Sequence, residues 1–335
     1  MTRKEKITEL QGIIRSELGG LITSDFVLLA CPYHSNIGDT LIWEGELAFF
    51  RECGRRMLAF GAIHTWNFRP LDKETIIVLH GGGNFGDIWP DAQNFALRVI
   101  ESYPDNPIIV FPQTVFYYDM ERAENDALRM ARHPRLTICA RDGRSFGFLK
   151  AHFRNTILLV PDLAFCIPQK ELQKYLPRKE KYSEKALLLE RTDKEIDPHR
   201  TQAFREKAGF ADRNDWPTME RTTRVTKFIY KLHGMIVRYD RKNRRFRHLQ
   251  LAALVDFLAM NRMRQANVRD GVRFMAPYRT VYSTRLHGVI LALMMDRETF
   301  FLDNNYGKLS DFYQTWLSGT EGIEHIQLPE KQIND

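Results

Sequence analysis

Short apolar runs alternate with helical patterns along most of this 335-residue chain. An uninterrupted run of four or five apolar residues is typical of a parallel strand that is buried on both faces. Helices are predicted between the runs, which lie at residues 26–30, 76–79, 108–111, 137–139 and 157–160. This alternation predicts an α/β fold whose parallel sheets are covered by helices.

The pattern pauses after Pro168 and resumes at Ala186. Residues 169–185 are polar and contain Pro177, which is typical of a linker. We therefore predict an N-terminal α/β domain over residues 1–168 and a C-terminal α/β domain over residues 186–330. Two such domains facing each other form a cleft at the carboxyl ends of their strands, where open α/β sheets bind ligands.

The positive charge is concentrated in residues 219–248, which form an insert in the second domain. The formal net charge is +7, and this segment alone carries +8, so the rest of the chain is close to neutral. Its aliphatic and aromatic residues alternate with basic ones, which suits peripheral contact with an anionic membrane. A solvated helical insert explains the composition about as well. No nucleic-acid-binding motif is recognisable, so we expect no nucleic-acid partner.

The cysteines and the hydropathy favour a cytoplasmic protein, which the basic insert would bring to the inner face of the cell membrane. No apolar run approaches the ~18–20 residues of a membrane span. The cysteines are too far apart for a C-x-x-C motif, and we expect buried, reduced thiols at Cys31, Cys53, Cys139 and Cys166.

Two motifs follow the first two long apolar runs. Asn36 and Asp39 lie where a helix is predicted to begin, and both residue types are good helix caps. The segment 80–87 is a glycine-rich loop that can approach a ligand closely and hold an anion with its amides. It matches G-x-G-x-x-G, but no acid that could bind a ribose follows the next strand.

Cations follow three further predicted strands. Arg141, Arg285 and Lys308 come from both domains, which suits a small ligand with several negative charges. An ion pair of Arg141 with Asp142 or Asp162 is the structural alternative. His287 lies two residues after Arg285 and can donate or accept a proton near neutral pH. No metal-binding motif is present, and we expect no metal.

These motifs together resemble the polysaccharide pyruvyl transferase family over roughly residues 25–316. Thr284-Arg285-Leu286-His287-Gly288 is the most specific stretch, and the glycine loop is the next. The resemblance implies two Rossmann-like domains facing a cleft, as in GT-B enzymes. It also implies transfer of pyruvate from phosphoenolpyruvate, as a ketal, to a sugar of a cell-surface polysaccharide or its precursor, without a cofactor. The acceptor of such an enzyme can be lipid-linked.

The resemblance implies that Arg141, Arg285 and His287 contact phosphoenolpyruvate, with Lys308 close by. We take His287 as the general acid, and Asp39, Glu44 and Asp87 as candidates for the base. The full set of candidate substrate-binding residues is Asn36, Gly82, Gly83, Asn84, Arg141, Ser145, Arg285, Leu286 and Lys308. A nucleotide-sugar glycosyltransferase of the same architecture and a non-catalytic polysaccharide-assembly protein are the alternatives.

Overall fold

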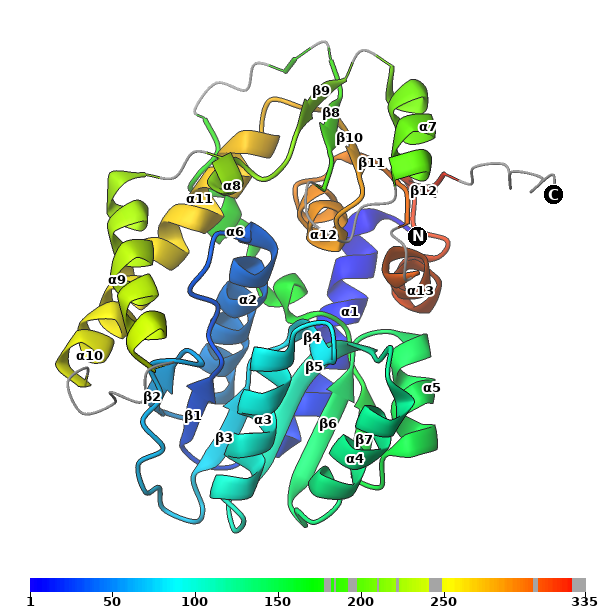
Figure 1. Ribbon diagram of the computed structural model, residues 1–335. Helices are drawn as coiled ribbons and strands as arrows, with labels where there is room; N and C mark the ends of the chain where they lie inside the picture. The colour runs from blue at the N-terminus through cyan, green and yellow to red at the C-terminus, as the bar shows by residue number, and fades with distance from the viewer. Residues whose placement is uncertain are drawn as a thin grey trace.

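The computed structural model describes residues 1–177, 182–183, 185–191, 198–209, 211–220, 223–240, 249–303 and 307–326. Two β-sheets, each flanked by helices, form the two halves of the molecule (Figure 1). Every described strand pairing is parallel. The predicted α/β fold with two Rossmann-like halves is therefore confirmed.

The first sheet has the order β2-β1-β3-β5-β6-β7, with β4 paired to β5. Its strands are β1 (Phe26–Leu29), β2 (Met57–Gly61), β3 (Ile76–Leu79), β4 (Gly82–Gly86), β5 (Ile108–Phe116), β6 (Leu136–Ala140) and β7 (Thr156–Leu159). The helices around it are α1 (Arg3–Leu18), α2 (Ile37–Cys53), α3 (Pro90–Ser102), α4 (Met120–Met130) and α5 (Gly143–His152), with short 3₁₀ turns at Gly19–Leu21 and Leu163–Cys166.

The continuous apolar runs are explained by the helices on both faces of this sheet. Phe26 and Leu28 pack into the apolar cluster that also contains α1 and α2. Val27 and Leu29 pack into a second cluster on the opposite face, with apolar residues of α3, α4 and α5. Alternate residues of one strand thus enter different cores, so no position of β1 is left for a polar side chain.

The second sheet has the order β12-β11-β10-β8-β9. Its strands are β8 (Leu187–Leu189), β9 (Asp212–Asn214), β10 (Thr280–Ser283), β11 (Glu298–Phe301) and β12 (Ile323–His325). The helices of this half are α7 (Pro198–Ala208), α8 (Pro217–Glu220), α9 (Arg224–Asp240), α10 (Leu249–Leu258), α11 (Arg264–Met275), α12 (Leu286–Met294) and α13 (Lys308–Phe312).

Several predicted boundaries differ from the structure. The glycine-rich loop contains the strand β4, and the predicted linker contains the short helix α6 (Gln169–Gln173). Helix α10 is followed by a π-helical turn at Ala259–Met263 and then by α11. Half of the basic insert forms the helix α9, whereas Arg221 and residues 241–248 lie outside the described residues.

Helix α1 connects the two halves. At its amino end, Arg3 Nε lies 2.6 Å from the Asp296 carboxylate, which follows α12. At its carboxyl end, Arg15 Nε lies 2.7 Å from the Glu52 carboxylate of α2. Its apolar face joins an apolar cluster that contains residues of both sheets, including Leu28. The two halves therefore share a core as well as a cleft.

The described cysteines are all free thiols, as expected, although Cys53 is only partly buried. Burial raises the pKa values of Cys31 and Cys139, so both thiols stay protonated at neutral pH. Within the described parts of the chain, no helix combines the length and the apolarity needed to cross a bilayer.

Candidate active site

A cleft of about 530 Å³ lies where the carboxyl ends of the two sheets meet. Its walls come from the segments after β1, β3, β6, β8, β9 and β10, together with the start of α13. The sequence-predicted residues that line it are Asn36, Asp39, Gly83, Asn84, Arg141, Arg285, Leu286, His287 and Lys308. Motifs separated by more than 250 residues in the chain are thus brought to one site.

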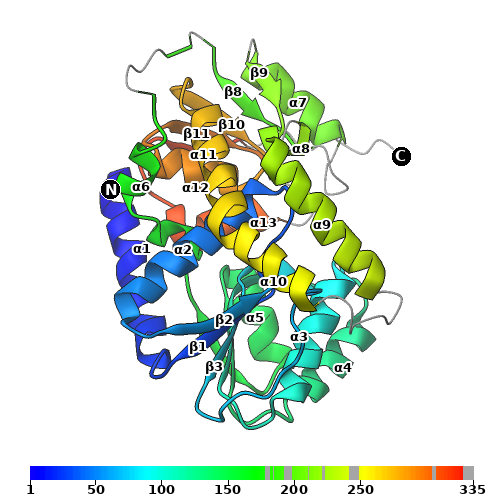
Figure 2. The same ribbon diagram turned by 90° about the vertical axis from the view of Figure 1, so that its left-hand side faces the viewer.

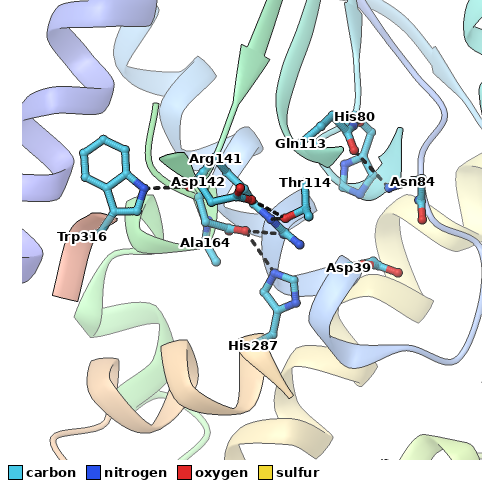
Figure 3. A network of polar contacts seen from close by, with 12 residues as sticks. Asp39, His80, Asn84, Gln113, Thr114, Arg141, Asp142, Ala164, His287 and Trp316 are labelled. Carbon is cyan, nitrogen blue, oxygen red and sulfur yellow. Dashed lines mark hydrogen bonds and ion pairs between the residues drawn. The ribbon is translucent and has the colours of Figure 1, made fainter. Parts of the chain in front are cut away.

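The side chain of Asp162 joins the two halves, because it contacts both Arg141 and His287, which point toward each other in Figure 3. Its Oδ2 accepts a hydrogen bond of 2.9 Å from Arg141 Nη1 and lies 3.2 Å from His287 Nε2. Burial by itself would raise the pKa of Asp162, but His287, Arg141 and the Ala164 amide together lower it well below its usual range. Asp162 is therefore a buried carboxylate that holds one site residue from each half.

Two cations converge on Gly83. Arg141 is fixed by Asp162 and by Thr114, whose Oγ1 accepts a 2.8 Å hydrogen bond from Nε. A Cβ at Gly83 would lie 3.3 Å from Arg141 Nη2 and 3.5 Å from Lys308 Nζ. The bare backbone of Gly83 thus gives both cations access to the same part of the cleft, where an anion would meet two positive charges.

The glycine-rich segment is held in place by α2 and β5. Glu46 of α2 accepts a 2.8 Å hydrogen bond from the Gly81 amide, and its other oxygen lies 2.8 Å from His80 Nδ1. Gln113 of β5 donates to the His80 carbonyl and accepts from the Asn84 amide. Gly82 has φ 145°, a conformation that favours glycine. Gly82 therefore shapes the strand, and it does not line the cleft.

Burial disfavours a charged His80, but the Glu46 carboxylate, with Asp39 and Asp162 farther away, raises the pKa of His80 on balance. The His80–Glu46 pair is almost fully buried beneath the glycine segment. It supports the segment and has no contact with the cleft.

The imidazole of His287 is confined on two sides. Asp162 lies at Nε2, and a Cβ at Gly38 in the first turn of α2 would come within 2.6 Å of Nδ1. Gly288 has a related role: a Cβ there would meet the Ser283 hydroxyl and Leu189 Cδ2, so only glycine lets α12 begin this close to the sheet. The two glycines therefore fix the position of the ring.

Asp39 lies in the first turn of α2, after the N-cap Asn36. Its Oδ2 accepts a 3.0 Å hydrogen bond from Asn36 Nδ2 and lies 3.4 Å from His34 Nε2. Burial raises the pKa of Asp39, but His34, His287, His80 and Arg141 lower it below its usual value on balance. Asp39 is therefore an ionised carboxylate in the wall of the cleft, as a general base requires.

Arg285 lines the cleft, but its guanidinium forms an ion pair with a carboxylate. Its Nε and Nη2 each donate a 2.6 Å hydrogen bond to Asp215, which follows β9. Both side chains are buried, so this bidentate pair closes the wall between β9 and α12. The resemblance implies that Arg285 contacts phosphoenolpyruvate, and in the structure its guanidinium is also held by this ion pair.

Four other candidates do not line the cleft, namely Gly82, Asp87, Ser145 and Glu44. Asp87 Oδ2 accepts hydrogen bonds from the Tyr118 and Asp119 amides, and Ser145 Oγ accepts one from the Val115 amide. These side chains, like Gly82, stabilise the turns and strands around the site. Glu44, a further candidate base, forms ion pairs with Arg51 and Arg264 instead.

Several residues of the cleft were missed by the motif analysis. Four of them, His34, Trp89, Arg191 and Trp216, line the cleft without belonging to any recognisable pattern. Asp215 was also missed, whereas Asp162 appeared only as a structural partner of Arg141. A carboxylate directly after a buried strand, as in Val160-Pro161-Asp162, is the one signal that could have identified a site residue.

Comparison with known proteins agrees with this arrangement. Residues 36–306 match the family model described as Polysaccharide pyruvyl transferase. The chain belongs to this family. The match begins at the Asn36 cap and extends past the His287 segment, so it contains the whole Asp162 junction. The family implies a polysaccharide-related acceptor for a pyruvyl transferase.

Two curated relatives of the pyruvyl transferase family cover most of the chain. The chain is 29% identical to the protein named "Putative pyruvyl transferase EpsO" of Bacillus subtilis (strain 168), over 99% of this chain and 95% of that protein. It is 26% identical to "Pyruvyl transferase 1" of Schizosaccharomyces pombe (strain 972 / ATCC 24843), over 87% of this chain and 69% of that protein.

The crystal structure of a functionally uncharacterised protein, KP1_0663 from Klebsiella pneumoniae subsp. pneumoniae NTUH-K2044, has the same fold. It superposes with a TM-score of 0.61 at 19% sequence identity, covering 94% of this chain and 99% of that chain.

Proposed function

We propose that this pyruvyl transferase takes pyruvate from phosphoenolpyruvate and places it as a ketal on a sugar of a cell-surface polysaccharide or its precursor. The observation that carries the proposal is the Asp162 junction. It holds a cation, Arg141, and a proton carrier, His287, on one carboxylate, beside a second cation, Lys308. Phosphoenolpyruvate carries a carboxylate and a phosphate, and its activation requires a proton, so this set of groups suits it.

The proposed reaction has two stages. Protonation of the methylene carbon makes the central carbon electrophilic, and one sugar hydroxyl adds there as its proton leaves to a base. A second hydroxyl of the same sugar then displaces inorganic phosphate and loses its proton, which gives the ketal. His287 supplies the proton in the first stage, and ionised Asp39 accepts one from a hydroxyl. Binding the diol beside the donor supplies much of the rate through proximity.

The acceptor is proposed to bind along the aromatic side of the same cleft. Trp89 and Trp216 line it; Trp216 is almost completely buried, whereas the indole of Trp89 is partly exposed. The flat aromatic surface of Trp89 can pack against the apolar face of a sugar ring. Asp91 and Arg191 line this cleft as well and supply polar groups for hydroxyl or acidic substituents of the glycan.

Incubation of the purified protein with phosphoenolpyruvate and a panel of glycosides tests the proposal. The expected result is release of inorganic phosphate together with a mass gain on the sugar of one pyruvate less one water. His287→Gln is expected to lower both signals by about 10²–10⁴-fold. Tight binding of UDP or GDP without any turnover of phosphoenolpyruvate would instead support a nucleotide-sugar glycosyltransferase.

A further inference from the structure

The outer face of helix α9 combines exposed cations with exposed apolar side chains. Lys227, Lys231 and Arg238 are spaced i, i+4 and i+11, so they lie along one stripe of the helix. Phe228 and Met235 are spaced i and i+7 and form a second stripe beside the first, in which Phe228 is 55% exposed. Both stripes face away from the protein core.

The inner face of α9 fixes this orientation. Ile229 and Ile236 are almost completely buried in the core. Tyr230 lies 3.4 Å from the Asn267 amide of α11, which in turn donates to Thr40 of α2. Helix α9 is therefore anchored through α11 to the first half of the molecule, and its outer stripes cannot turn inward without breaking these contacts.

Helix α10 packs beside α9 and extends the apolar surface. Both helices lie on the side of the molecule that faces the viewer in Figure 2. Leu254 and Phe257 of α10 are 46% and 60% exposed. A soluble helix pair normally carries polar residues at such positions, so several large apolar side chains on two adjacent helices indicate a contact surface.

The charge on this surface is predominantly positive. Residues 224–239 contain no aspartate or glutamate, and the one acid of α9 is its last residue, Asp240. The one acid of residues 250–263 is Asp256, whose Oδ1 is buried beneath α10. A cationic stripe beside an apolar stripe complements a surface that is anionic at the outside and apolar beneath. A nucleic acid would match the cations, but it would leave Leu254, Phe257 and Met235 in water.

We propose that the outer face of α9 and α10 binds an anionic lipid membrane, with both helices lying in the plane of the interface. The proposed surface consists of described residues only: Arg224, Val225, Lys227, Phe228, Lys231, Met235, Arg238, Tyr239, Leu254 and Phe257. This inference concerns the location of the protein and does not depend on the proposed reaction.

The surface is connected to the cleft by a short path. Helix α8 directly precedes α9, and its Thr218 hydroxyl donates a 2.5 Å hydrogen bond to the Ser35 carbonyl. Ser35 lies in the cleft wall beside Asn36. Membrane binding through α9 would therefore hold the cleft close to the lipid headgroups, where an acceptor glycan carried on a lipid would be presented.

Sedimentation with lipid vesicles tests the proposal. The full chain is expected to sediment with phosphatidylglycerol vesicles at low salt and to stay in solution with phosphatidylcholine vesicles. Each basic residue near an anionic leaflet strengthens binding about fivefold, so K227Q/K231Q/R238Q is expected to weaken it about a hundredfold. Salt at about 1 M is expected to release the wild type, because the Debye length falls to about 3 Å.

A second variant tests the contribution of the apolar stripe to binding, and a third serves as a control for the loss of charge. F228S/M235S is expected to lose most vesicle binding while keeping the full charge. The matched control is R132Q/K150Q/R154Q, which removes three exposed cations around α4 and α5, on the other side of the molecule in Figure 1, and should bind as the wild type does. The proposal is overturned if the wild type does not bind anionic vesicles at low salt, or if the control loses as much binding as the α9 variants.

Discussion

His287 Nε2 lies 3.2 Å from Asp162 Oδ2, although the two residues follow strands of different sheets. The same carboxylate oxygen accepts from Arg141 Nη1 at 2.9 Å. One buried anion thus orients both the proposed general acid and the proposed donor-binding cation. Because the Asp162 carboxylate faces Nε2, the proton on that nitrogen is held in place. The other ring nitrogen, Nδ1, lies on the side of Gly38 and Asp39.

Asp162→Asn is expected to lower kcat by about 10²–10⁴-fold. The amide keeps the shape of the side chain but removes the charge that holds both His287 and Arg141 in place. Steady-state kinetics measures the loss of kcat, and thermal unfolding shows whether the fold is kept.

The control for this variant is Asp119→Asn, at the N-cap of α4, where asparagine caps as well as aspartate does. Its kinetics should match those of the wild type. An unchanged kcat in Asp162→Asn would exclude Asp162 from the positioning of His287.

Gly38→Ala is expected to lower turnover by about ten- to a hundredfold with little change in overall fold. The new Cβ would lie 2.6 Å from His287 Nδ1, so the ring must move, and a shift of about 1 Å in a catalytic group is costly. Kinetic assays combined with thermal unfolding measure the two properties separately.

Gly12→Ala provides the matched control, because a Cβ at this exposed position of α1 has nothing within 4 Å. It should leave turnover unchanged and stabilise the helix by about 0.5–1 kcal/mol. Equal turnover in the two alanine variants would show that Gly38 does not constrain the ring.

Arg285→Ala is expected to destabilise the fold by about 3–5 kcal/mol, because it leaves the Asp215 carboxylate buried without its bidentate partner. The motifs alone suggest an exposed cleft residue whose loss the fold would tolerate. Denaturant unfolding of the single variant and of the double variant D215N/R285A gives the measurement. The double variant should recover part of the loss, and equal stability of the wild type and Arg285→Ala would refute the structural role of the pair.

The sequence was sufficient to predict the sheets and the motifs at their ends, because both follow from local patterns. Strands buried on two faces read as continuous apolar runs, and β1, β3, β5 and β6 were identified in this way. The edge strand β2 was missed although its first four residues are apolar, and only one of its five residues is buried. The glycine segment has the composition of a loop, but pairing with β5 makes it a strand.

The pairing of site residues could not be predicted, because it depends on contacts between distant parts of the chain. Asp215 and Arg285 are 70 residues apart, and nothing near either one indicates the other. Asp162 and His287 are 125 residues apart. Both arginines were therefore expected to be ligands of the substrate, whereas each is also held by a buried carboxylate, Arg141 by Asp162 and Arg285 by Asp215.

Asp256→Asn is expected to stabilise the protein at neutral and alkaline pH. Burial of the carboxyl group raises the pKa of Asp256 from 3.8 to about 6, although the nearby Thr65 and Tyr33 hydroxyls lower it in part. Above pH 6 the folded protein therefore contains a destabilising charge. As the pH falls from 6 to 4, the folded state takes up a proton before the unfolded state does, so the wild type gains stability relative to the variant.

The difference in unfolding free energy between Asp256→Asn and the wild type should be about 1–3 kcal/mol near pH 8 and should approach zero only as the pH falls below the ordinary aspartate pKa of 3.8. Denaturant unfolding of both proteins at a series of pH values measures it. A difference that does not vary with pH would mean that Asp256 titrates normally in the folded protein.

Helix α1 also limits how the molecule can move. Its first turn is tied to Asp296 in one half and its last turn to Glu52 in the other, with a buried apolar face between them. A large rotation of one half relative to the other would break the contacts at one end of α1. Substrates are therefore expected to enter and leave without a large domain movement. Transient opening would then be visible as faster amide hydrogen exchange at one end of α1, far from the catalytic groups themselves.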